Sequence, residues 1–293
     1  MDTLTWHGIP TDVPLWKIDH GLHRIEKLRG FWTEFSESIP DLIAFTVDEG
    51  AAEVSSISTS RHVRVTAEIS EYPNYLYMSS LVSEITHTLR SSLDTLIWGY
   101  YSASQHKVSE GAERKITFPI YSHEKYFLAN KNSKLKGAPP EVVERIGRVQ
   151  PYDSRNFLLN QNPLSTLAWV DNQNKHRTLV FAAITTLEHG VGFGSDEELT
   201  VAELKQLQEG VVTDFPPLSN KVVLFEGAIS MKVRTEDIHP DIELMPVIEL
   251  EEGPVPLFDV LDTLAGYVRA VVLYVRDGNN DARHDLSQWF EIE

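Results

Sequence analysis

Apolar residues recur at spacings of three and four along four long stretches of the chain, which is the pattern of helices with one buried face. The clearest stripe consists of Val82, Ile85, Leu89, Leu93 and Leu96. We therefore predict long helices over residues 14–38, 77–105, 163–175 and 255–276. Pro40 is expected to end the first of them, because proline interrupts helical hydrogen bonding. A shorter helix is predicted after Pro139-Pro140, since proline suits a first helical turn.

Alternating apolar and polar positions predict β-strands in other parts of the chain. The segment 62–69 alternates and is expected to pair with 41–47 in a hairpin, joined by a long connection over 49–60. Further strands are predicted over residues 115–120, 179–187, 221–233 and 242–250. Helices and antiparallel strands in separate runs favour the α+β fold class.

The same patterns suggest how the chain is divided. Residues 1–187 form a helix-rich half with an inserted hairpin and a polar cluster, and residues 188–293 form an acidic half of strands and a helix. We expect both halves to belong to one globule. The glycine-rich segment 190–194 is interpreted as a flexible turn, because the acidic residues that follow it disfavour phosphate binding.

Composition excludes several classes of protein. With 42% hydrophobic residues the chain has enough apolar material for a core, which excludes global disorder. No apolar run approaches the length of a membrane span, and the first residues do not resemble a secretory signal. There are no cysteines, so disulfides, thiolate metal sites and cysteine nucleophiles are excluded. We expect a cytoplasmic protein with no membrane partner and no metal or other cofactor.

Charge is distributed unevenly along the chain. The net charge is −17, and residues 178–293, with 7 basic and 22 acidic residues, account for −15 of it. By contrast, the segment 107–148 contains 9 basic and 5 acidic residues. An acidic protein repels polyanions at a distance. The basic segment is therefore either a solvated loop or a small nucleic-acid footprint.

Two groups of polar residues are candidates for chemistry. His87, Arg90 and Asp94 share one face of the helix 77–105, and Arg90 and Asp94 have the spacing of an ion pair. The second group is the polar run 171–177 together with 150–155, where His176 is suited to act as a base near neutral pH. The catalytic candidates are His87, Arg90, Asp94 and His176. The ligand-binding candidates are Tyr152, Arg155, Asn174, Lys175 and Arg177.

Both groups also have structural interpretations. Basic residues near the end of a helix satisfy its free carbonyl groups and complement its dipole. Because both groups contain polar residues on core-like faces, we expect Arg90 or Asp94 to contact the run 174–177. Trp98 and Tyr101 lie on the face opposite the apolar stripe. We expect this face to be covered as well, within the chain or in a homodimer through the helix 77–105.

Four motifs of this chain resemble a large uncharacterised family of bacterial proteins that is common in actinobacteria. They are L-R-S-S-L-D-T-L-I-W at 89–98, T-F-P-I at 117–120, Q-P-Y at 150–152 and N-K-H-R at 174–177. The resemblance spans about residues 14–275. It implies no established activity.

In that family the helix contains Arg-x4-His, which is similar to the Arg-x4-6-His signature of HEPN ribonucleases, whose paired helices bring Arg and His onto a scissile phosphate. Here Thr95 stands at the histidine position. The resemblance implies a HEPN-like protein of a defence or toxin type, associated with RNA or a phosphorylated ligand, with a degenerate catalytic motif. The alternative is a non-enzymatic module that binds a ligand or a protein. The sequence leaves open whether the chain is an enzyme.

Overall fold

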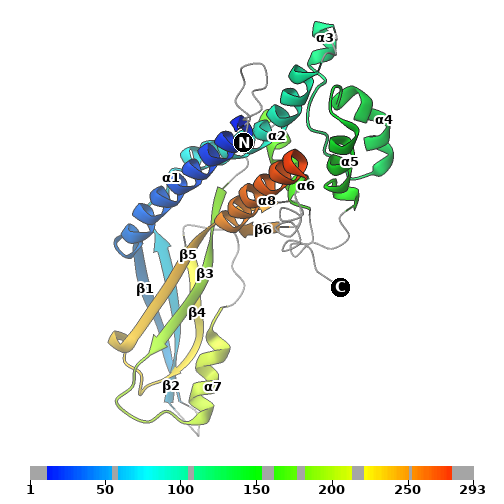
Figure 1. Cartoon of the computed structure of the whole chain (residues 1–293). Helices are drawn as coiled ribbons and strands as arrows, with labels where there is room; N and C mark the ends of the chain where they lie inside the picture. Colours follow the sequence, from blue (N-terminus) through cyan, green and yellow to red (C-terminus); the bar gives the residue numbers. More distant parts are fainter. Residues whose placement is uncertain are drawn as a thin grey trace. The chain divides into compact units, whose positions relative to one another are not determined.

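A computed structural model describes residues 12–54, 59–104, 109–153, 162–176, 182–212, 221–250 and 253–278. The chain forms two compact units (Figure 1). The helical unit consists of Met1–Arg29, Leu76–Phe181 and Ile248–Glu293, and the sheet unit consists of Gly30–Tyr75 and Ala182–Val247. Each unit therefore draws segments from both sides of residue 187. The predicted α+β class, with long helices and antiparallel strands, is confirmed.

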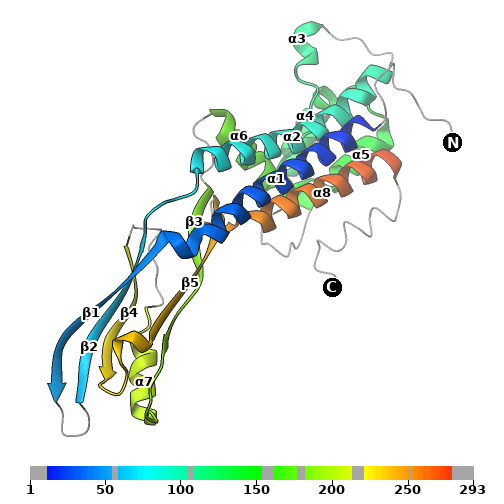
Figure 2. The ribbon, with the colours of Figure 1, turned by 90° about the vertical axis from the view of Figure 1, so that its left-hand side faces the viewer.

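Three long helices run side by side in the helical unit, as Figures 1 and 2 show. They are the first part of α1 (Val13–Leu42), α2 (Tyr75–Ala103) and α8 (Leu257–Asp277). On α8 pack α5 (Pro140–Arg148) and α6 (Pro163–His176). Gly278, at φ 63°, ends α8 in the left-handed conformation that favours glycine. No helix in the described part of the chain has the length and apolarity of a membrane span.

The predicted apolar stripes are the buried faces of these helices. Every member of the α2 stripe is buried, and so are the residues of α8 that the periodicity places inside: Leu257, Leu261, Leu264, Val268, Val271 and Val275. Helix α1 buries Ile18, Ile25 and Leu28, whereas Leu22, which has the same helical spacing, keeps 36% of its surface exposed. Helix α1 also continues through Pro40 to Leu42, so the prediction that this proline ends it was wrong. Pro40 lies in the last turn, so its ring and its missing amide affect only the end of the helix.

The region between α2 and α6 differs most from the prediction. Residues 115–120 form no strand, although Ile116 and Phe118 are buried as a strand's residues would be. Two helices in this region, α3 (Glu110–Glu113) and α4 (Glu124–Lys134), were not predicted. In α4 only Phe127 is buried, so its sequence carries almost no apolar periodicity. A short 3₁₀ turn, η1 (Pro151–Asp153), follows α5.

The sheet unit contains a three-stranded antiparallel sheet in the order β1-β2-β4. Its strands are β1 (Ile43–Val54), β2 (Thr59–Ile69) and β4 (Lys221–Ser230). The predicted hairpin is confirmed, but not its long connection, because pairing continues from Ile43 opposite Ile69 to Val54 opposite Thr59. A register shift between Glu49 and Ala52 accommodates the small residues there.

A second sheet has the order β3-β5-β6, formed by β3 (Ala182–Phe193), β5 (Ile238–Leu250) and β6 (Gly253–Pro256). The glycine-rich segment 190–194 was predicted as a flexible turn, but residues 190–193 belong to β3. Val191 and Phe193 alternate with glycine and pack on the apolar core of the unit, which explains the strand. Helix α7 (Val201–Gly210) packs on β4, and the 3₁₀ turn η2 (Thr235–Asp237) precedes β5.

Candidate functional site

The predicted pair Arg90 and Asp94 binds the backbone of the irregular segment 116–121. Arg90 and Asp94 form an ion pair of 3.1 Å between Nη2 and Oδ1. Arg90 Nη2 also donates to the carbonyl oxygen of Phe118 at 2.6 Å, and the Phe118 amide donates to Asp94 Oδ1 at 2.8 Å. The two side chains thus satisfy both backbone groups of a buried residue that has no neighbouring strand.

Gln150, from the end of α5, holds the same segment from another side. Its Nε2 donates to the carbonyl of Pro119 at 2.8 Å, and its Oε1 accepts from the amide of Tyr121 at 3.0 Å. We call Arg90, Asp94 and Gln150 the polar clamp. Three of the four motifs of the family resemblance, at 89–98, 117–120 and 150–152, therefore meet in one hydrogen-bonded network.

Two partly buried lysines lie beside the clamp. Lys134 Nζ donates to the Thr117 hydroxyl at 3.0 Å. Burial and the charge of Arg90 lower the pKa of Lys134, while Asp94 acts in the opposite direction. Burial also lowers the pKa of Lys17, against the opposing charge of Asp94. Both lysines thus add positive charge near Asp94, whose side chain keeps 34% of its surface exposed.

Thr95, which stands at the histidine position of the signature, is bound by Lys17 from α1. Lys17 Nζ donates to the hydroxyls of Ser91 and Thr95, each at 2.7 Å. Thr95 in turn donates to the carbonyl of Ser91 at 2.8 Å. A hydroxyl bound in this way fixes α1 against α2 and takes up no proton near neutral pH.

His87 meets the second group of polar residues through Asp171. Its Nδ1 lies 3.3 Å from Asp171 Oδ1. The His87 side chain is 63% exposed, whereas that of Asp171 is only 5% exposed. His87 and Asp171 thus join the two groups, whereas the expected contact was between Arg90 or Asp94 and the run 174–177. A buried carboxylate of this kind orients a histidine ring.

Several candidates lie outside the residues that the structure describes. They are Arg155 and Arg177, and the side chains of Asn174, Lys175 and His176 at the end of α6. The contact expected between Arg90 or Asp94 and the run 174–177 stays a prediction. So do the roles assigned to these residues.

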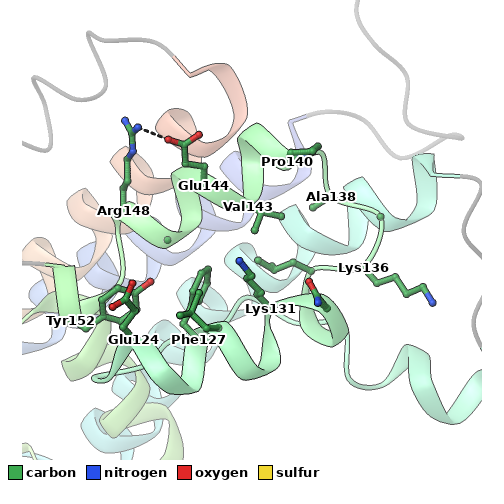
Figure 3. A pocket seen from close by; sticks show the side chains of 15 residues that line it. Glu124, Phe127, Lys131, Lys136, Ala138, Pro140, Val143, Glu144, Arg148 and Tyr152 are labelled. Carbon is green, nitrogen blue, oxygen red and sulfur yellow. Dashed lines mark hydrogen bonds and ion pairs between the residues drawn. The ribbon is translucent and has the colours of Figure 1, made fainter.

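Tyr152 is the predicted ligand-binding residue that lies at a cavity. A pocket of about 700 Å³ opens between α4 and α5, and Tyr152 lines it (Figure 3). Its apolar lining includes the buried Phe127 and Leu135, together with Val143. Gly137, at φ 85°, turns the chain between the two helices, and a Cβ there would lie 2.5 Å from Ser104 Oγ. The α4–α5 loop is thereby held against the end of α2.

Charged side chains surround this α4–α5 pocket. Lys131, Lys136, Arg148, Glu124 and Glu144 all line it. Arg148 binds Glu144, with 2.5 Å between Nη2 and Oε1, so these two charges neutralise each other. Sequence reasoning missed the pocket residues of α4, because this helix was not predicted. The basic stretch 107–148, which contains most of the pocket, was the available signal.

The face of α2 opposite its core stripe is covered only in part. Tyr101 is buried and its hydroxyl donates to Glu113 Oε1 at 3.1 Å, whereas Trp98 keeps 36% of its surface exposed. The homodimer through this helix stays a prediction. Within the described ranges no cluster of three or more His, Asp or Glu side chains could hold a metal ion.

Comparisons of the chain with models of protein families, with curated proteins and with solved structures find no match. The family resemblance and the activity it implies therefore remain predictions.

Proposed function

We propose that the chain is a non-enzymatic binding module that holds a small organic molecule in the α4–α5 pocket. The pocket itself carries the proposal. Its volume of about 700 Å³ is that of a ligand site, and it combines apolar residues with several charged side chains. Sites for small molecules are typically concave, mostly apolar and about 300–1,000 Å³ in volume.

The clamp supports a binding role over catalysis at α2. Arg90 and Asp94 each form a hydrogen bond with the backbone of Phe118, so the positions of both side chains are set by this buried segment. A catalytic pair needs groups directed at a reacting atom. The RNA-associated activity implied by the family resemblance stays a prediction.

Three basic residues of 107–148 have partners within the fold, which favours a small ligand over RNA. Lys134 binds Thr117, Arg145 donates to the carbonyl of Val275 at 3.0 Å, and Arg148 pairs with Glu144. These cations serve separate partners within the fold. A surface for nucleic acid needs a row of cations that are available to phosphates.

The test is a screen of small organic fragments by ligand-observed NMR, followed by two tryptophan variants. Val143→Trp fills the pocket, and Glu141→Trp adds the same side chain to an exposed position of the same helix. We expect fragments that bind the wild type and Glu141→Trp but not Val143→Trp. Circular dichroism establishes that both variants fold. The proposal is overturned if no fragment binds at millimolar concentration, or if binding survives in Val143→Trp.

A further inference from the structure

We infer that the α4–α5 pocket selects an amphipathic monoanion, an apolar body that ends in a carboxylate, and that Lys131 holds the carboxylate. The inference rests on the proposed function and adds to it the chemical class of the ligand. It follows from the apolar lining, from the direction of one lysine and from the balance of the remaining charges.

The apolar body is recognised by the lining between the two helices. Phe127 and Leu135 are buried in the fold, and Val143 faces them from α5. Phe127 also contacts the ring of Tyr152, with 5.9 Å between the ring centroids. Leu128 also lines the pocket and keeps 50% of its surface exposed. An aromatic or branched ligand that covers it removes apolar surface from water, which favours binding by about 25 cal/mol per Å².

The carboxylate is recognised by Lys131. Figure 3 shows this side chain rising from α4 toward Val143 on α5, whereas Lys136 extends away from the pocket. Among the described residues, Lys131 Nζ has no hydrogen-bond acceptor and no acidic partner. An ammonium group beside an apolar lining gains more from an anion than one in open water, because nearby apolar atoms weaken solvent screening.

The other charges restrict the ligand to a single anionic group. Arg148 is neutralised by Glu144, so it offers no second cation. Glu124 also lines the pocket and disfavours another anion. The chain as a whole carries a net charge of −17, which repels polyanions more strongly than a monoanion.

The experiment compares three ligands with the same phenylbutyl body. Phenylbutyrate has a carboxylate, phenylbutanol is neutral and phenylbutylamine is cationic. Titration calorimetry measures each of them against the wild type, Lys131→Gln and Lys125→Gln. Lys125 is exposed on the same helix and does not line the pocket. The two substitutions change net charge equally, so the second one controls for long-range electrostatics. We expect phenylbutyrate to bind the wild type about tenfold more tightly than phenylbutanol, the effect of one charge-assisted hydrogen bond.

Lys131→Gln is expected to abolish this preference, and Lys125→Gln to preserve it. The inference is overturned if phenylbutyrate does not bind, if it binds no better than phenylbutanol, or if both lysine variants weaken it equally. If all three ligands bind equally and Val143→Trp removes all of them, the pocket is still a binding site and only the ligand class is wrong. The two proposals can thus fail separately.

Discussion

At the scale of single residues, the polar clamp explains why polar side chains occupy buried or partly buried positions of α2 and of the turn after α5. Phe118 is fully buried in a segment without strand partners. An unpaired buried amide or carbonyl is costly. Asp94 and Arg90, both on α2, pair the amide and the carbonyl of Phe118, and Gln150 pairs the carbonyl of Pro119. The clamp residues therefore stabilise the folded state whether or not a ligand is bound.

Asp94→Ala is expected to destabilise the protein by about 1–3 kcal/mol, because it leaves the buried amide of Phe118 without an acceptor. Asp94→Asn keeps an oxygen acceptor and should recover part of the loss. Urea unfolding followed by circular dichroism measures both variants. The control is Asp262→Ala, which breaks an exposed ion pair with Arg29 and should cost only about 0–1 kcal/mol. Equal losses of unfolding free energy in Asp94→Ala and Asp262→Ala would show that the Asp94–Phe118 hydrogen bond stabilises the fold no more than an exposed ion pair does.

At the scale of elements, α7 begins with a reciprocal cap that the sequence pattern T-x-x-E encodes. The Glu203 amide donates to the Thr200 hydroxyl at 3.3 Å, and the Thr200 amide donates to Glu203 Oε2 at 2.7 Å. Lys232 Nζ, just beyond β4, lies 3.3 Å from the same carboxylate oxygen. The backbone amide of Thr200, together with the hydroxyls of Ser230 and Thr200, lowers the pKa of Glu203 to about 2.

This depressed pKa predicts a pH-dependent contribution of the cap. An unfolded glutamate has a pKa of about 4.3, so the folded state retains the charged carboxylate to lower pH than the unfolded state does. The stabilisation is complete above about pH 5 and is lost as the pH falls toward about 2. We expect Glu203→Gln to be less stable than the wild type at neutral pH, and the difference to shrink below pH 5. Urea titrations of both proteins at a series of pH values measure it.

A pH-independent difference between wild type and Glu203→Gln would contradict the assignment. Glu209→Gln is a suitable control, because Glu209 lies on the exposed side of the same helix. Its effect should be small at every pH, since exposed ion pairs contribute little.

At the scale of the whole molecule, the charge asymmetry of the sequence follows the two units. The sheet unit contains 20 acidic and 6 basic residues, a net charge of −14, against −3 for the helical unit. The part of the helical unit that holds the pocket, residues 76–181, has 13 basic and 9 acidic residues. The pocket thus lies in a part of the chain whose net charge is positive, which repels an anion least.

Repulsion within the sheet unit predicts that salt stabilises the protein. Raising NaCl from about 20 mM to about 200 mM shortens the screening length several-fold, and should shift the urea midpoint upward. Substituting the exposed Asp241 and Glu243 by lysine reduces the charge of this unit and should weaken the salt response. The matched control, Glu141→Lys with Glu249→Lys, makes the same change in the helical unit. A midpoint that falls with salt would contradict this prediction.

The helices that were predicted correctly are those whose buried faces follow a local periodicity in the sequence. The stripes of α2 and α8 repeat over several turns, and they predicted both helices and their buried faces. Helix α4 has one buried residue and escaped prediction. The segment 115–120 has the apolar residues of a strand, but its hydrogen bonds go to side chains from two helices. Periodicity reports burial and says nothing of the partner.

By itself the sequence determined the α+β class, the long helices, the hairpin, the asymmetry of charge and the ion pair of Arg90 with Asp94, because each depends on spacing or composition along the chain. The sequence also predicted Tyr152 as a ligand-binding residue, and Tyr152 lines the α4–α5 pocket. Only the tertiary structure decided that Arg90 and Asp94 hold Phe118, that Lys17 binds Thr95, and that Lys131 points into a cavity. Those contacts join residues distant in sequence. Their geometry depends on how the helices pack, which no local pattern encodes.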